Sequence, residues 1–227
     1  MTQLKSHVRQ FLLCIAVMTS AGVSCADDNG DHEKFRLRTF EVQLTNLTRG
    51  QPIARVMVAS HGAGMLLLDT SNIELANLAE AGNGLPMADK LREIPGVTSV
   101  VVADSINPVG GGSTILITAK KDDHFSLGAM LGNSNDAFVG LMDMQLPKGK
   151  RSVTFLAPAY DAGTETNDES CATVPGPACR GEALSYYDEG EGFVTIHNGI
   201  HGIGELNASI YDWRNPVAKI VVTRVYK

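Results

Sequence analysis

The sequence predicts an all-β fold, a sandwich of two antiparallel sheets with one or two short helices inserted. Roughly eight or nine short apolar segments are separated by turns rich in Gly, Asn, Asp and Pro, the pattern of a sandwich or barrel. Helical spacing appears in one region only, whereas a parallel α/β fold would alternate strands with helices throughout. The expected strands are residues 40–47, 53–60, 97–103, 114–119, 125–131, 137–146, 152–156, 193–197 and 217–225.

Alternation and turn chemistry justify these strands along the chain. Residues 40–47 (FEVQLTNL) alternate apolar and polar positions, as a half-buried strand does, and a turn follows at 48–52. The NPVGGG sequence at 107–112 is a clear loop between two strands. Lys148-Gly149-Lys150 predicts a tight turn, and Arg214-Asn215-Pro216 precedes the last strand. Residues 65–68 add one further apolar patch.

The helical region comprises two short helices. In residues 71–81, Ile73, Leu75 and Leu78 recur at helical spacing, and Gly82 can end this helix in a left-handed conformation. Residues 86–94 begin with Pro86, which suits the first turn of a helix.

The front of the chain has the pattern of a secretory signal peptide, residues 1–26. Lys5 and Arg9 precede an apolar run at 11–18 that is too short to span a bilayer. Small residues at Ser24-Cys25-Ala26 predict cleavage after Ala26 and a secreted or periplasmic protein. The alternative is lipidation at Cys25, although no Leu stands three residues before it. Residues 27–39 are expected to be a flexible N-terminal segment before the domain at 40–227.

Charge limits the range of partners. The formal net charge is −6, and removing the leader, which contains Lys5 and Arg9 but no acidic residue, makes it −8. Such a protein repels nucleic acid and anionic membrane surfaces. No later apolar run is long enough to cross a bilayer, so no membrane insertion of the mature chain is expected.

Two cysteines remain after the leader, Cys171 and Cys179, in a Pro- and Gly-rich loop at 164–187. In an exported protein, two close cysteines predict a disulfide bond that restrains the loop. A thiolate pair on zinc is the alternative, although no further Cys and no nearby His completes such a site.

Two acidic turns lie at the ends of apolar segments: Asn133-Ser134-Asn135-Asp136, and Tyr160-Asp161 followed by AGTE. If both turns meet at one end of the sandwich, Asp136 and Asp161 gather the hard oxygen ligands that Ca²⁺ prefers. The alternative is that both aspartates only cap their turns by accepting backbone N–H bonds.

The strings FEVQLTNL, LAEAGN, SNDAFVGL, PAYDAGTE and WRNPVAKIVV together resemble the spondin amino-terminal domain, and in particular its bacterial exported members. The resemblance runs from about Phe40 to Val225 and implies a C2-like β-sandwich that binds Ca²⁺ between loops. By residue-for-residue matching, the implied metal ligands are Asp136 and Asp161. The family pattern adds a Glu near Ile117, and the residues that could replace it are Glu165, Asp168 and Asp143.

Other residues suggest weaker hypotheses. His197 and His201 have the spacing of a helical metal pair, but the glycines around them favour hydrogen-bonded loop histidines. Ser60-His61 lacks the third group and the oxyanion hole that a catalytic serine needs. Trp213, the only Trp, is expected to be a packing anchor before the last strand.

These observations favour a non-enzymatic binding or adhesion module with a weak loop-end Ca²⁺ site. Its partner is an unknown extracellular or envelope protein or glycan. One alternative is an extracellular hydrolase acting on polymers, with Asp161 and Glu165 as acid and base. Another is a structural envelope protein without a ligand.

Overall fold

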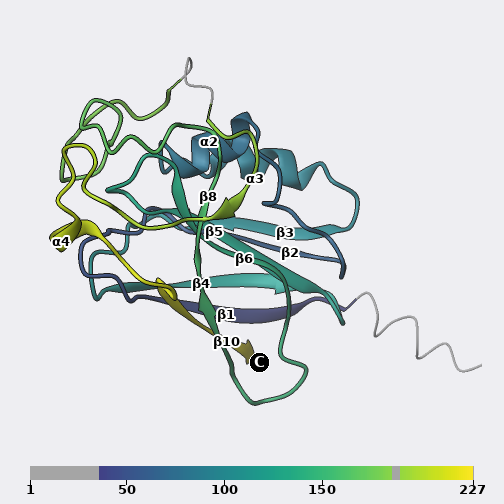
Figure 1. The fold of residues 1–227 in the computed structure, drawn as a ribbon. Coiled ribbons are helices and arrows are strands. Elements are labelled where there is room, and N and C mark those ends of the chain that lie inside the picture. The colour runs from purple at the N-terminus through teal and green to yellow at the C-terminus, as the bar shows by residue number, and fades with distance from the viewer. Residues whose placement is uncertain (1–35, 186–189, 227) are drawn as a thin grey trace, which may run out of the picture.

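Ten strands form two antiparallel sheets in the computed structural model, which describes residues 36–185 and 190–226 (Figure 1). The predicted all-β sandwich is confirmed. The four-stranded sheet has the order β4 (Gly112–Ala119), β1 (Arg38–Asn46), β10 (Ala218–Val225), β7 (Val153–Ala157). The six-stranded sheet has the order β3 (Val97–Val102), β2 (Met57–His61), β5 (His124–Met130), β6 (Ala137–Gln145), β8 (Ala159–Asp161), β9 (Thr195–Ile196).

The space between the sheets holds the main core. Alternate residues of β1 and β10 point inward and are almost completely buried, because side chains along a strand face opposite sides of the sheet. Ile117 of β4 belongs to this core and is 1% exposed. Each such apolar side chain contributes about 1.5–3 kcal/mol by leaving water. Representative members are Phe40, Val42, Leu44, Ile115, Ile117, Phe125, Leu127, Val139, Ile220 and Val222.

Two helices cover the outer face of the six-stranded sheet. They are α2 (Ile73–Ala79) and α3 (Leu85–Arg92), and Figure 1 shows both above β2, β3 and β5. Asn72 caps α2 by accepting from the backbone N–H of Leu75 at 2.9 Å. Because this sheet has the core on one side and helices on the other, β2 is buried on both faces. The two predicted helices are confirmed with slightly different ends.

Several elements differ from the sequence prediction. The strand expected at 53–60 begins at Met57, and Ile53 forms only isolated bridges with Asn107 and Leu131. Residues 65–68 form no strand. The strand expected at 193–197 shortens to the two residues of β9. The short strand β8 and helix α4 (Ala208–Tyr211) had no distinct signal in the sequence.

The predicted leader, the lipidation position Cys25 and most of the predicted flexible segment lie outside the described residues. Strand β1 begins at Arg38, so the last two residues of the segment 27–39 are already in a sheet. Within the described ranges, no helix has the length and apolar character needed to span a membrane.

Candidate metal centre

Three neighbouring strands bring the polar residues of the site together. Asp136 directly precedes β6, and its neighbour Ala137 pairs with Asp161, the last residue of β8. Across β8, Asp161 pairs with Thr195 of β9, and His197 follows that strand immediately. Because antiparallel neighbours place one strand's start beside the other's end, the three side chains reach the same end of the sandwich.

Asp136, Asp161 and His197 form a buried cluster in which one ligand atom from each lies within 4.8 Å of the others. They are 0%, 8% and 7% exposed. The two acidic turns therefore meet as the sequence suggested. The sequence named His197 only as a possible pair with His201 and did not place it beside the two aspartates, because nothing in the sequence showed that β9 pairs with β8.

Asp136 keeps one oxygen without a partner. Its Oδ2 accepts the backbone N–H groups of Thr164 at 2.8 Å and Glu165 at 3.2 Å. Its Oδ1 is buried and has no hydrogen-bond partner among the described residues. Burial first, and then the charge of Asp161, raise the pKa of Asp136 to about 8. Asp136 therefore keeps a proton at neutral pH unless a cation replaces it.

A chain of hydrogen bonds joins Asp161 to His197 through Asn167. Asp161 Oδ1 accepts from Gly163 N at 2.7 Å, and Asp161 Oδ2 accepts from Asn167 Nδ2 at 2.6 Å. Asn167 Oδ1 lies 2.9 Å from His197 Nε2. Burial raises the pKa of Asp161, while these two hydrogen bonds lower it.

His197 is held as a neutral ring. Its Nδ1 accepts from the Gly199 N–H at 2.9 Å, so Nε2 carries the proton and donates to Asn167. Burial, followed by the charge of His201, lowers the pKa of His197 to about 4. The ring packs against Trp213 with centroids 4.9 Å apart, and Trp213 is 6% exposed, as expected of a packing anchor. Both ring nitrogens are engaged, so His197 can bind a metal only by giving up a hydrogen bond.

Glu165 adds a third carboxyl group beside Asp136. Its Oε1 accepts from Ser185 Oγ at 3.0 Å, while Oε2 is buried without a partner in the described part of the chain. Burial first, with a smaller effect from the charge of Glu80, raises the pKa of Glu165 to about 7. The charge of Glu165 in turn contributes to the raised pKa of Asp136.

Asp143 and Asp168, the other two residues that could replace a Glu near Ile117, do not face Asp136. Asp143 is at the opposite end, where its carboxylate accepts from Gly64 N and contacts His124 Nδ1 at 2.9 Å. Asp168 Oδ1 accepts from Asn135 Nδ2 at 3.1 Å and from Ser170 N at 2.8 Å. Glu165 is therefore the candidate that faces Asp136.

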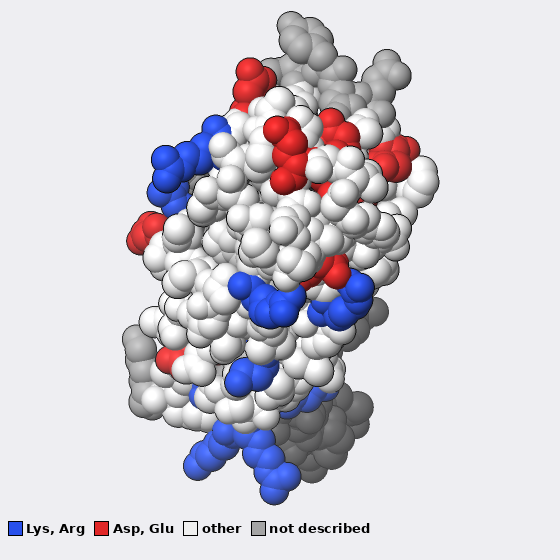
Figure 2. Space-filling view, turned by 60° about the vertical axis from the view of Figure 1, so that its left-hand side comes forward, with Lys and Arg blue, Asp and Glu red and all other residues white. Residues whose placement is uncertain are grey.

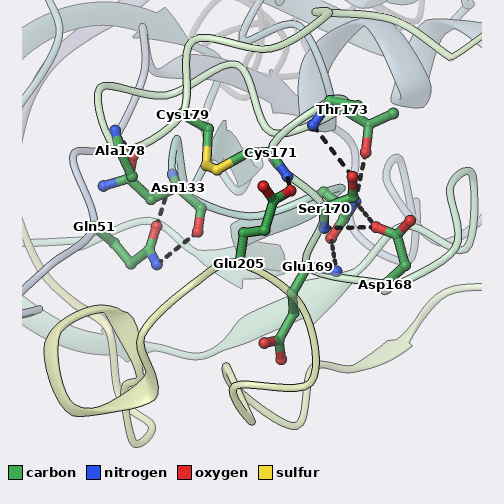
Figure 3. The surroundings of a disulfide bond; sticks show 12 residues. Gln51, Asn133, Asp168, Glu169, Ser170, Cys171, Thr173, Ala178, Cys179 and Glu205 are labelled. Carbon is green, nitrogen blue, oxygen red and sulfur yellow. Dashed lines mark hydrogen bonds between the residues drawn. A yellow bond between two sulfur atoms is a disulfide. The ribbon is translucent and has the colours of Figure 1, made fainter.

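The predicted disulfide between Cys171 and Cys179 is present, at a sequence separation of 8 (Figure 3). It restrains the loop that follows Glu165. The loop is tied to the first acidic turn, because Ala178 N donates to Asn133 Oδ1 at 3.0 Å and Asn135 Nδ2 donates to Thr173 Oγ1 at 3.1 Å. The disulfide thus restrains a loop that contacts the acidic turn just before Asp136.

A half-enclosed cleft of about 320 Å³ opens beside the cluster. Asp161 and His197 are part of its wall, with Phe193 and Ile203 as exposed apolar residues. Among the described residues that line the cleft, none is Lys or Arg. Its lining consists of Asn135, Asp161, Asn167, Glu169, Glu191, Phe193, Thr195, His197, Asn198, Gly199, Ile200, His201 and Ile203.

The Ser60-His61 pair is structural. Ser60 Oγ donates to Thr118 O at 2.7 Å, and His61 Nε2 is bonded to Ser126 Oγ at 2.8 Å. Ser60, His61 and Ser126 are 0% exposed, so none of these groups can meet a substrate in this conformation.

A scan of the chain against protein-family models finds no match, and a search of curated proteins finds no relative.

Proposed function

We propose that this chain is an exported, non-enzymatic binding or adhesion module of the spondin amino-terminal type. In this proposal Ca²⁺ binds at Asp136 and Asp161 and orders the loop end of the sandwich. The observation that carries the proposal is the buried Asp136 Oδ1, which has no hydrogen-bond partner among the described residues and lies in a cluster with a second carboxylate. Buried polar atoms without partners are rare, and an ion is one explanation for them.

The donor chemistry suits Ca²⁺ better than a transition metal. Ca²⁺ takes about six to eight oxygen ligands, and Asp136 and Asp161 supply carboxylate oxygens. His197 is the only nitrogen donor of the cluster and is engaged at both ring nitrogens. Glu165 adds a third carboxyl group beside Asp136, whereas Ile117, near which the family pattern has a Glu, is a buried core residue. Backbone carbonyls and water would complete the shell.

Metal binding would relieve the electrostatic cost of this cluster. Burial raises the pKa of all three carboxyl groups, and the charges of Asp161 and Glu165 raise the pKa of Asp136 further. A divalent cation stabilises the charged forms and displaces the proton of Asp136. With so few anionic ligands we expect a dissociation constant on the order of 10⁻⁴–10⁻³ M, as in other extracellular modules.

The cleft beside Asp161 is the place where we expect an extracellular or envelope protein or glycan to bind. It combines polar groups, such as Asn167 and Thr195, with the exposed ring of Phe193. Such clefts, with a few convergent polar groups, are the usual form of binding sites. An ordered metal site in the wall would fix the cleft's shape, because Asp161 and Asn167 belong to both.

The hydrolase alternative has less support from the geometry. A glycosidase needs two carboxyl groups on opposite sides of one substrate. Asp161 lines the cleft, but Glu165 does not and is 1% exposed. Phe193 is the only aromatic residue of the described cleft wall besides its histidines. These facts favour binding over polymer cleavage.

Thermal unfolding with Ca²⁺ or with a chelator tests the metal proposal. We expect millimolar Ca²⁺ to raise the melting temperature, because a ligand that binds only the folded state stabilises it. Asp136→Asn should abolish this shift while leaving the metal-free protein about as stable, because the amide is neutral like the protonated carboxyl group that it replaces. Asp122→Asn, an exposed carboxylate at the opposite end, is the matched control. A melting temperature that does not change on addition of Ca²⁺ would contradict the metal proposal.

Capture of partners from an envelope extract, with and without chelator, tests the binding role. Partners retained by the wild type with Ca²⁺ and lost by Asp136→Asn would support a module ordered by metal. Turnover of chromogenic glycosides or esters that Asp161→Asn abolishes would instead favour the hydrolase. Ca²⁺ binding without any retained partner would favour the structural envelope protein.

A further inference from the structure

The end of the sandwich opposite the carboxylate cluster is strongly basic. We define this basic end as residues 36–38, 120–123, 146–152 and 224–226, all of which are described. These segments contain eight basic side chains and two acidic ones, in a chain whose formal net charge is −6. The basic residues are Arg36, Arg38, Lys120, Lys121, Lys148, Lys150, Arg151 and Arg224.

Strand register brings these segments together. Arg38 at the start of β1 pairs with Ala119, which directly precedes Lys120, and Phe40 pairs with Arg224. His124 at the start of β5 pairs with Gln145 at the end of β6, just before the turn that carries Lys148. Arg224 Nη1 also donates to Lys148 O at 3.5 Å. In Figure 2, Lys and Arg side chains lie at the lower end and also across the middle and at the upper left, while most visible acidic side chains lie in the upper half.

The three basic residues of the turn at 146–152, Lys148, Lys150 and Arg151, carry exposed charge. Lys148 Nζ is 3.7 Å from Asp122 Oδ1, and both side chains are more than 60% exposed, so this ion pair is weak. The other acidic residue of these segments, Asp123, is 8% exposed, and its Oδ2 accepts from Lys120 N at 2.8 Å. Asp143, at the same end of the sandwich, contacts His124 Nδ1 at 2.9 Å. Lys150 and Arg151 are both exposed.

Apolar side chains stand between the basic ones. Leu37 is 56% exposed and Tyr226 is 49% exposed. The Tyr226 ring lies 4.7 Å from Arg224 Cζ and 6.0 Å from Lys150 Nζ. Aromatic and aliphatic groups beside Lys and Arg suit a membrane–water interface, where the apolar part enters the headgroup region and the charge meets phosphate.

We propose that this basic end is a peripheral docking surface for an anionic lipid bilayer. The net charge of the chain predicts repulsion from such a surface, but salt screens charges beyond a Debye length of about 8–10 Å. The anionic headgroups therefore interact mainly with the positive side chains of the basic end and little with the acidic residues farther away. The exposed Leu37 and Tyr226 favour a bilayer over an anionic polymer, which offers no apolar layer.

The position of the chain outside the structure agrees with this orientation. Residues 1–35 lead directly into Arg36, at the basic end. If the chain is lipidated at Cys25, the alternative that the sequence leaves open, the anchor would join the domain at the basic end. The cleft with Asp161 would then face away from the membrane, toward a partner. The lipid proposal requires no bound metal and stands apart from the Ca²⁺ proposal.

Vesicle co-sedimentation in the presence of a chelator tests the proposal. We expect the protein to sediment with phosphatidylcholine vesicles that contain phosphatidylglycerol, not with phosphatidylcholine alone, and to be released by salt. Lys148→Glu, Lys150→Glu and Arg151→Glu together should weaken binding at least about 100-fold, because each basic residue near the surface contributes roughly fivefold.

A matched control reverses three exposed charges at the loop end: Arg55→Glu, Arg180→Glu and Arg214→Glu. It carries the same net charge as the first variant and should retain most of the binding. The milder pair Lys150→Gln and Arg151→Gln should weaken binding about 25-fold and serves if the triple variant does not fold. Equal losses in both triple variants, binding to heparin without binding to vesicles, or no vesicle binding by the wild type would each overturn the proposal.

Discussion

The side-chain amide of Asn167 donates to Asp161 Oδ2 at 2.6 Å and thereby fixes the direction of a carboxylate on the wall of the cleft. The same amide accepts from His197 on its other side. In the proposed metal site, an amide in this position would orient Asp161 as a ligand. Partners of this kind change metal affinity by about 10–100-fold when they are removed.

We therefore expect Asn167→Ala to weaken Ca²⁺ binding about tenfold or more and to raise the pKa of Asp161 further. Calorimetric titration with Ca²⁺ measures the first effect. Asn198→Ala is the control, because Asn198 lines the same cleft as an exposed residue one position after His197. Equal Ca²⁺ affinities for the wild type and Asn167→Ala would contradict the positioning role.

The sequence predicted the meeting of Asp136 and Asp161 because both lie at strand ends next to recognisable turns. It could not place His197 beside them, because the pairing of the two-residue strand β9 with β8 leaves no signal in the sequence. It also misplaced the start of β2, because helices on one face and the core on the other remove the apolar–polar alternation. The net charge of the chain did not reveal the basic end, because Arg38 and Lys148 are distant in sequence. They come to the same end through the pairing of β1 with β10 and the contact of Arg224 with Lys148 O.

Gly163 occupies a position that no other residue fits. Its φ is +63°, and a Cβ there would lie 2.4 Å from Phe193 O. Its N–H also donates to Asp161 Oδ1. Gly163→Ala should lower the free energy of unfolding by roughly 2–4 kcal/mol, combining left-handed strain with a backbone collision.

Urea unfolding measures this change. Gly149→Ala is the matched control, because no atom lies within 4 Å of a Cβ at Gly149. The control should change stability by less than about 0.5 kcal/mol. If both variants unfold at the same urea concentration, the backbone at Gly163 can accept a Cβ without the predicted strain.

Removal of the disulfide should destabilise the folded protein. Cys171 and Cys179 close a short loop with a separation of 8, so Cys171→Ala with Cys179→Ala should cost roughly 2–3 kcal/mol by the chain-entropy model. Ca²⁺ affinity should fall as well, because this loop contacts Asn133 and Asn135. Urea midpoints with and without reductant check the first expectation: reductant should shift the wild type only. A wild-type midpoint that reductant leaves unchanged would show that the cross-link does not restrain folding.

The carboxylate cluster should make the metal-free protein less stable as the pH rises from about 6.5 to 8. The pKa of Asp136 is raised to about 8 and that of Glu165 to about 7, so the folded state holds protons that the unfolded state has already released. Stability from a raised carboxyl pKa is lost as the pH rises toward the folded value. His197 acts in the opposite direction, because its pKa is lowered to about 4, but its effect ends near pH 6.5.

Melting temperatures measured in chelator across this window check the prediction. We expect a loss of roughly 1–2 kcal/mol, since one proton per pH unit corresponds to about 1.4 kcal/mol. Asp136→Asn should flatten most of the slope, because the amide does not titrate. Saturating Ca²⁺ should also flatten the slope, because the bound cation keeps the carboxylates deprotonated in the folded state, as they already are in the unfolded state. If the slope of the wild type persists unchanged in Asp136→Asn, groups other than Asp136 titrate in this range. The proposed competition between a proton and Ca²⁺ for Asp136 would then be wrong.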